Sequence, residues 1–118
     1  MSKILVIDDE EDLRDLISLY LRVAGHEAVT AQDGEEGLRK FDESLFDAVI
    51  TDITMPKCNG DEVARYIRNS AKRIPIVAIT GTPWDVDHGI FDRVMDKPFL
   101  YEEFIECVES VMLKDRSD

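Results

Sequence analysis

Short runs of β-branched and aliphatic residues alternate along this chain with segments whose apolar residues recur every three or four positions. The runs cover residues 4–7, 27–31, 48–51, 76–79 and 93–96. Nearly continuous apolar runs are typical of strands buried on both faces, and the spacing of three and four is typical of amphipathic helices. Strands that alternate with helices in this way predict an α/β fold with right-handed crossovers, a doubly wound sheet of five parallel strands.

Helices are expected between these strands and after the last one. Their positions are residues 11–24, a segment after Asp33-Gly34, a segment after Asn59-Gly60 and residues 101–112. Gly25 follows the first of them, as is common at the end of a helix. No internal repeat or linker interrupts the pattern, so residues 1–118 are expected to form one domain.

The charge of the chain is strongly acidic. Fourteen Lys and Arg residues stand against 26 Asp and Glu residues, a formal net charge of −12. A surface of this charge argues against direct binding to nucleic acid or to an anionic membrane. The longest uncharged stretch is residues 74–84, too short to cross a bilayer, and no signal peptide follows Lys3. With only Cys58 and Cys107 for thiols, a cytoplasmic protein is expected.

Polar side chains follow four of the five expected strands. Asp8 and Asp9 follow the first strand, Asp52 the third, Thr80 the fourth and Lys97 the fifth. Parallel strands bring their carboxyl ends to one edge of a sheet, where ligands bind. The sequence therefore predicts a site that gathers carboxylates, a hydroxyl and an ammonium group.

This set of groups suits phosphoryl chemistry. Carboxylates that lie close together repel one another unless a cation compensates them, and hard oxygen ligands favour Mg²⁺. A bound metal with Lys97 and Thr80 would hold the oxygens of a phosphoryl group, and one carboxylate could attack phosphorus. Asp52 is the best placed for this attack, because it follows the expected middle strand.

Four segments occur in a fixed order along the chain: residues 4–10 (ILVIDDE), residues 52–56 (DITMP) with Gly60 after them, residues 79–81 (ITG) and residues 97–99 (KPF). In this order, and over the whole chain, they resemble the receiver domain of bacterial response regulators, the phosphoacceptor module of two-component signalling. The resemblance implies the flavodoxin-like strand order 2-1-3-4-5. It also implies a module that catalyses only its own phosphorylation and dephosphorylation.

The resemblance implies a role for each residue that follows a strand. Asp52 would accept a phosphoryl group from the phosphohistidine of a sensor histidine kinase or phosphotransfer protein. Lys97 would pair with Asp52 and then with the phosphoryl group, and Thr80 would move to hydrogen-bond it. The modification would change binding to a downstream partner that the sequence does not identify.

The same resemblance implies a Mg²⁺ site with four protein ligands. Asp9 and Asp52 would ligate the ion, Asp8 mostly through water, and Thr54 through its backbone carbonyl. Thr54 and Thr82 occupy positions that influence the lifetime of the phosphoryl group in this family, and the peptide bond after Lys97 is expected to be cis.

Two features depart from the family pattern. Only 16 residues lie between Thr80 and Lys97, fewer than usual, so the fourth helix is expected to be a stub or an irregular loop. Val94 stands where the family often has an aromatic ring that moves on activation. We therefore expect the usual output face to be remodelled, with phosphorylation intact and the signal read either by another surface or by an unusual partner.

The other aromatic residues, histidines and cysteine considered are expected to have structural roles and no part in the chemistry of the site. Trp84 and Phe91 are expected to cover the edge of the core, and His26 and His88 to lie on the surface. Cys58 lies near the expected site, but no redox role is expected for it.

Two other functions compete with a phosphoacceptor. A phosphatase with a nucleophilic Asp of the haloacid dehalogenase type would need a second Asp where Thr54 stands. A binding module that works without phosphorylation would have no use for the full set of residues that follow the strands. Addition of mass from acetyl phosphate and Mg²⁺, absent in Asp52→Asn, would separate these functions from a phosphoacceptor.

Overall fold

Strands and helices alternate along the chain in the computed structural model, which describes residues 2–55, 58–70, 72–87 and 89–116. The elements are β1 (Lys3–Ile7), α1 (Glu11–Val23), β2 (Glu27–Ala31), α2 (Gly34–Glu43), β3 (Ala48–Asp52), α3 (Gly60–Asn69), β4 (Ile76–Thr80), the 3-10 turn η1 (Pro83–Asp85), β5 (Arg93–Asp96) and α4 (Tyr101–Arg116). Each expected strand is present, and α4 runs four residues beyond its predicted end at residue 112.

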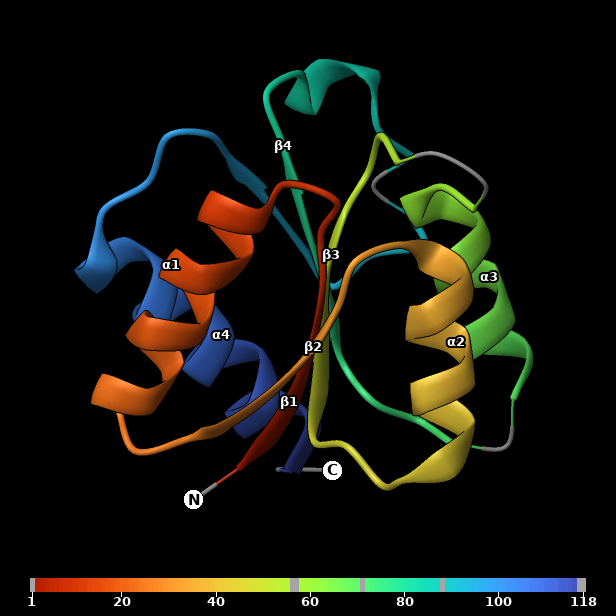
Figure 1. Ribbon diagram of the computed structural model, residues 1–118, viewed down its shortest axis with the longest axis horizontal. Helices are drawn as coiled ribbons and strands as arrows, with labels where there is room; N and C mark the ends of the chain where they lie inside the picture. Colours follow the sequence, from red (N-terminus) through yellow and green to blue (C-terminus); the bar gives the residue numbers. More distant parts are fainter. Residues whose placement is uncertain (1, 56–57, 71, 88, 117–118) are drawn as a thin grey trace.

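The five strands form one parallel sheet in the order β2-β1-β3-β4-β5, which confirms the predicted fold class and strand order. Figure 1 shows the sheet between two layers of helices, with α1 and α4 on one side and α2 and α3 on the other. In the register of β1 and β3, Ile7 pairs with Thr51. Asp8 therefore leaves β1 beside the last residue of β3, Asp52.

Alternate residues of the central strands belong to two separate cores. On β1, Leu5 and Ile7 pack with the α2 and α3 side, and Ile4 and Val6 with the α1 and α4 side. All four side chains are at most 1 % exposed. A strand in the middle layer has no face toward water, so its sequence is apolar at successive positions.

The ends of the helices follow from local side-chain chemistry. The Asp33 side chain accepts a hydrogen bond from the Glu36 backbone N–H (2.8 Å) at the start of α2. At the start of α3, Asn59 and Glu62 form a reciprocal capping box. After α1 the chain turns through Gly25, whose φ of 91° is costly for residues with a side chain.

Among its described residues, the segment between β4 and β5 contains no α-helix. Its only helical turn in the part of the chain that the structure describes is η1, which confirms the predicted shortening of the fourth helix. Val86, Ile90 and Phe91 pack onto the α2 and α3 side of the sheet from this segment, and Phe91 is buried as expected.

Two sequence-based expectations about surface and core are wrong. Trp84 does not cover the core: its side chain is 77 % exposed, because η1 stands out beyond the carboxyl ends of the strands (Figure 1). The His26 side chain is only 10 % exposed, because Glu109 of α4 lies against it, 2.9 Å from Nε2. The expected surface position of His88 lies outside the described residues.

Three further features complete the fold. The peptide bond between Lys97 and Pro98 is cis, as predicted. At the start of α4, the backbone N–H of Leu100 donates to the Glu103 carboxylate (3.2 Å), which compensates for the lack of a polar cap. A bilayer-spanning helix, which must be both long and apolar, does not occur in the described ranges.

Candidate functional site

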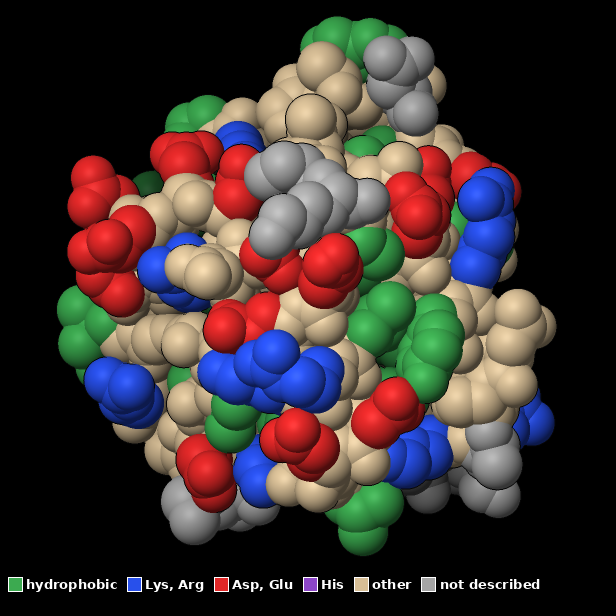
Figure 2. Space-filling view, turned by 45° about the vertical axis from the view of Figure 1, so that its right-hand side comes forward, with side chains coloured by type: hydrophobic (Ala, Val, Ile, Leu, Met, Phe, Trp, Pro, Cys, Tyr) green, Lys and Arg blue, Asp and Glu red, His purple; other side chains and the backbone are tan. Residues whose placement is uncertain are grey.

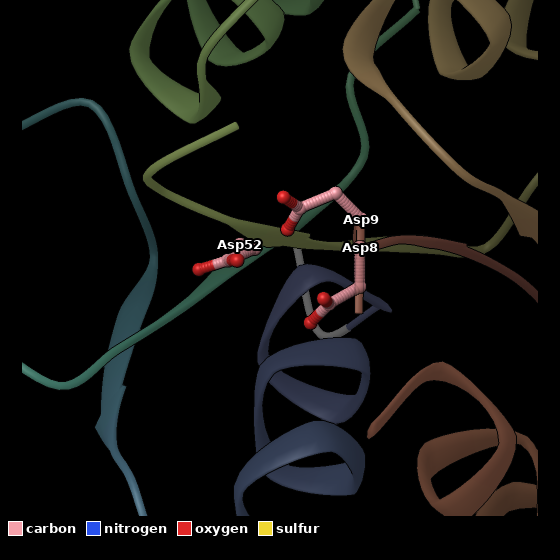
Figure 3. A group of neighbouring side chains, drawn as sticks. All are labelled: Asp8, Asp9 and Asp52. Carbon is pink, nitrogen blue, oxygen red and sulfur yellow. The ribbon is translucent and has the colours of Figure 1, made fainter. Parts of the chain in front are cut away.

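Three carboxylates meet where β1 and β3 end. One oxygen each from Asp8, Asp9 and Asp52 lies within 4.8 Å of the others. Figure 3 shows the three side chains near one another at the ends of these two neighbouring strands. The chain thus brings together the acids that the sequence pattern predicted at this edge of the sheet.

Asp8 is the most deeply buried of the three. Its side chain is 1 % exposed, and Oδ1 accepts a hydrogen bond from the Glu10 backbone N–H (2.8 Å). The other oxygen, Oδ2, is buried and has no hydrogen-bond partner among the described residues. Burial raises the pKa of Asp8 from 3.8 to about 6, although the Glu10 N–H opposes this rise.

Asp52 is also buried, but it has a cationic partner. Its Oδ1 accepts from the Ile53 backbone N–H (2.9 Å) and lies 3.5 Å from Lys97 Nζ. Burial raises the pKa of Asp52, and the nearby Lys97 ammonium opposes that effect. A Cβ on Gly60 would lie 2.5 Å from the Asp52 carbonyl oxygen, so only glycine lets α3 begin this close to the nucleophile candidate.

Lys97 reaches the cluster from the loop after β5. Its Nζ lies between Asp52 Oδ1 and Glu10 Oε1, the latter 3.9 Å away, and its backbone N–H donates to the Thr80 carbonyl (3.0 Å). Glu10 was not predicted as a site residue, although its place directly after Asp8 and Asp9 was a signal for it.

Thr80 ends β4 next to the cluster and is 4 % exposed. Its Oγ1 accepts a hydrogen bond from the Thr82 backbone N–H (3.0 Å) and lies 3.3 Å from the Thr82 hydroxyl. The structure therefore adds a direct bond between two threonines that the sequence only placed near each other.

Two residues complete the surroundings of the carboxylates. The Arg14 guanidinium, one turn into α1, donates to the Asp8 carbonyl (2.8 Å), a contact that no sequence pattern indicates. Thr54 follows β3 and is exposed; none of the described hydrogen bonds joins its side chain to the three acids. Its predicted role concerns the backbone carbonyl alone.

Cys58, near the site in sequence, belongs to the core. It packs with the α2 and α3 side of the sheet and is 8 % exposed. Burial and nearby carboxylates raise the pKa of its thiol, which disfavours the reactive thiolate.

The donor set fits a hard divalent cation. Asp8, Asp9 and Asp52 offer carboxylate oxygens from one small volume, and Asp8 Oδ2 is a buried acceptor that lacks a donor. A cation among these oxygens would satisfy that atom and relieve their mutual repulsion. Mg²⁺ is the ion that such carboxylates with retained waters commonly bind.

The chain is similar to known proteins over nearly its whole length. Residues 4–109 match the family model of the response regulator receiver domain. The chain is 33 % identical over 115 residues to the alkaline phosphatase synthesis transcriptional regulatory protein PhoP of Bacillus subtilis, covering 93 % of this chain and 48 % of that protein. It spans about half the length of the curated relatives it matches first.

Solved structures show the same architecture. A response regulator receiver domain protein from Clostridium thermocellum superposes with a TM-score of 0.89 at 28 % identity, covering 98 % of both chains. The response regulator TrrA of Thermotoga maritima, solved in complex with Mg²⁺ and BeF, has a TM-score of 0.87 at 38 % identity, covering 94 % of this chain and 99 % of that one. With its strand order and the match over residues 4–109, the chain belongs to the response regulator receiver domain family of two-component systems.

Proposed function

We propose that this receiver domain takes a phosphoryl group from the phosphohistidine of a sensor histidine kinase or a phosphotransfer protein onto Asp52, in a Mg²⁺-dependent reaction. The carboxylate cluster is the observation that supports the proposal most strongly. Asp52 lies within 4.8 Å of two further acids and 3.5 Å from the Lys97 ammonium. We place this module in the cytoplasm, as one domain over residues 1–118.

The metal would be held by Asp8, Asp9 and Asp52 together with the backbone carbonyl of Thr54. When bound, Mg²⁺ would neutralise charge on the phosphoryl oxygens and so lower the barrier to transfer. The relative TrrA, whose structure contains Mg²⁺ and BeF, supports the choice of ion.

In the transfer step, an ionised Asp52 oxygen attacks phosphorus. The new bond joins this oxygen to phosphorus, the bond from phosphorus to the donor's histidine nitrogen breaks, and the leaving nitrogen keeps the electron pair and takes up a proton. Lys97 stabilises the negative charge on the transferred group, because its Nζ already lies beside Asp52. Hydrolysis of the aspartyl phosphate by water returns the domain to its starting state.

Acetyl phosphate tests the proposal without a cognate kinase. We expect intact-mass spectrometry to show the mass of one phosphoryl group added in the presence of Mg²⁺, and none after chelation with EDTA. Asp52→Asn should abolish the addition. Asp15→Asn makes the same charge change at an exposed position on α1 and should leave it intact.

Other outcomes would support the competing functions. No added mass on the wild-type domain would favour a binding module that works without phosphorylation. Continued turnover of a phosphate ester by the purified protein would favour a phosphatase.

A further inference from the structure

The Asp9 carboxylate is held in place by no described contact. Asp9 is exposed, and its side chain takes part in none of the described hydrogen bonds or ion pairs. One of its oxygens nevertheless lies within 4.8 Å of carboxylate oxygens of Asp8 and Asp52. The Asp8 side chain, by contrast, is buried and accepts a hydrogen bond from the Glu10 backbone N–H (2.8 Å). The direction of the Asp9 side chain therefore depends on the backbone that carries it.

Arg14 holds the peptide unit that joins Asp8 to Asp9. The last paired residue of β1 is Ile7, so the Asp8 carbonyl lies beyond the register of the sheet. The Arg14 guanidinium Nη1, which comes from α1, donates to this carbonyl (2.8 Å). On the other side of the same residue, the Asp8 backbone N–H donates to the Ala31 carbonyl (3.1 Å). Because a peptide unit is planar, a bond that holds its carbonyl also fixes the orientation of the Asp9 nitrogen and Cα.

We propose that Arg14 is a positioning residue for the metal site: its hydrogen bond to the Asp8 carbonyl directs the Asp9 carboxylate toward those of Asp8 and Asp52. The inference rests on the proposed function, in which these three acids hold Mg²⁺. Arg14 is not itself a ligand, because a guanidinium group has no acceptor to offer a cation. It acts through the backbone, as groups outside a metal's own ligands do when they orient those ligands.

The contacts of Arg14 favour an action through the backbone over an action through charge. Figure 2 shows acidic side chains over much of the face it presents, with basic side chains among them. Arg39, Lys40 and Arg68 each form an ion pair with a carboxylate. Arg14 is half-buried beside the acidic cluster, yet none of the described ion pairs includes it, and its side chain donates to a backbone carbonyl.

The two actions predict effects of opposite sign on Mg²⁺ affinity. A positive charge beside a metal site repels an incoming cation, so removal of an Arg14 that acted through charge alone would tighten Mg²⁺ binding. Removal of an Arg14 that acts through the backbone frees the peptide unit between Asp8 and Asp9. Mg²⁺ binding then weakens, because the Asp9 carboxylate must be ordered at the moment the ion binds.

Calorimetric titration of the whole domain with Mg²⁺ distinguishes the two actions. Arg14→Met removes the guanidinium group and keeps an unbranched side chain that suits a helix. We expect the Kd for Mg²⁺ to rise about 10-fold. Arg22→Met is the matched control: it makes the same change at an exposed position in the last turn of α1 and should bind Mg²⁺ as the wild-type domain does.

Phosphorylation by acetyl phosphate, followed by intact-mass spectrometry, gives a second readout. Arg14→Met should need about 10-fold more Mg²⁺ to reach half of its maximal rate. At saturating Mg²⁺ its rate should approach that of the wild-type domain, whereas a general loosening of the fold would lower the rate at every Mg²⁺ concentration. Circular dichroism in EDTA reports whether the variant is folded, and Arg14→Gln, which also lacks the guanidinium group, takes its place in both measurements if it is not.

Failure of the inference and failure of the proposed function give different results. If the wild-type domain binds Mg²⁺ and a folded Arg14→Met domain binds it equally or more tightly, the positioning role is overturned and the proposed function stands. A lower rate for Arg14→Met at saturating Mg²⁺, with no change in the Mg²⁺ needed for half of that rate, would also overturn the positioning role. If the wild-type domain neither binds Mg²⁺ nor gains mass from acetyl phosphate, the proposed function fails and the role of Arg14 falls with it.

Discussion

Replacing Asp8 by Asn should make the metal-free domain more stable. Asp8 is almost fully buried, and its Oδ2 has no hydrogen-bond partner among the described residues. Asn has nearly the same volume and keeps an oxygen that can accept from the Glu10 N–H. It removes the buried negative charge and turns an amide donor toward the other two carboxylates.

The size of the effect follows from the pKa of Asp8. Raising this pKa from 3.8 to about 6 costs the ionised folded state about 3 kcal/mol at neutral pH, since one pKa unit corresponds to about 1.4 kcal/mol. We therefore expect Asp8→Asn to raise the free energy of unfolding by about 2 to 3 kcal/mol. For a domain of this length, each 1 kcal/mol corresponds to roughly 3 to 5 °C in Tm.

The assay is urea unfolding at pH 7.5 in EDTA, repeated with Mg²⁺. The wild-type domain should gain stability from Mg²⁺, because the ion binds only the folded state, and Asp8→Asn should lose most of this gain. Asp9→Asn is the matched control: it removes a charge from the same cluster at an exposed position, so its stability in EDTA should change much less. If the Asp8→Asn domain is no more stable than wild type in EDTA, the buried charge of Asp8 does not destabilise the metal-free domain.

Between about pH 4 and pH 6, and without metal, Asp8 is protonated in the folded domain but ionised in the unfolded chain. The free energy of unfolding of the wild-type domain in EDTA should therefore fall as the pH rises through this window. Urea unfolding at several pH values should show that Asp8→Asn lacks this contribution of Asp8 to the pH dependence. Gly60→Ala should lose about 1 to 3 kcal/mol of stability, because its Cβ would lie 2.5 Å from the Asp52 carbonyl oxygen, whereas Gly81→Ala meets nothing within 4 Å and should change little in the same assay. His26→Ala should lower the free energy of unfolding by about 1 to 2 kcal/mol, because the ring, whose side chain is only 10 % exposed, makes two hydrogen bonds; a thermal melt like that of wild type would contradict this.

The fold and the acidic cluster could be predicted because their determinants are local. Strands of a parallel sheet covered on both faces are apolar at successive positions, and residues 4–7 have this pattern. Side chains that directly follow such strands must lie at one edge, so Asp8, Asp9 and Asp52 could be placed together without knowing any contact.

The features that were missed depend on how separate elements pack. His26 is buried because Glu109, 83 residues away in the sequence, lies beside it, and the spacing of apolar residues along the chain does not indicate this contact. Trp84 is exposed because η1 projects beyond the sheet, whereas an apolar residue in a short loop more often packs inward. The contact from Arg14 to the Asp8 carbonyl likewise depends on where α1 sits over the end of β1.

A Mg²⁺ site formed by the carboxylates of Asp8, Asp9 and Asp52 can be measured by calorimetric titration of the purified domain with Mg²⁺ at pH 7.5, with Asp9→Asn and Asp15→Asn titrated in parallel. We expect a single binding event in the wild-type and Asp15→Asn domains, and its loss or strong weakening in Asp9→Asn. Absence of binding at millimolar Mg²⁺, or equal binding by Asp9→Asn, would contradict this expectation.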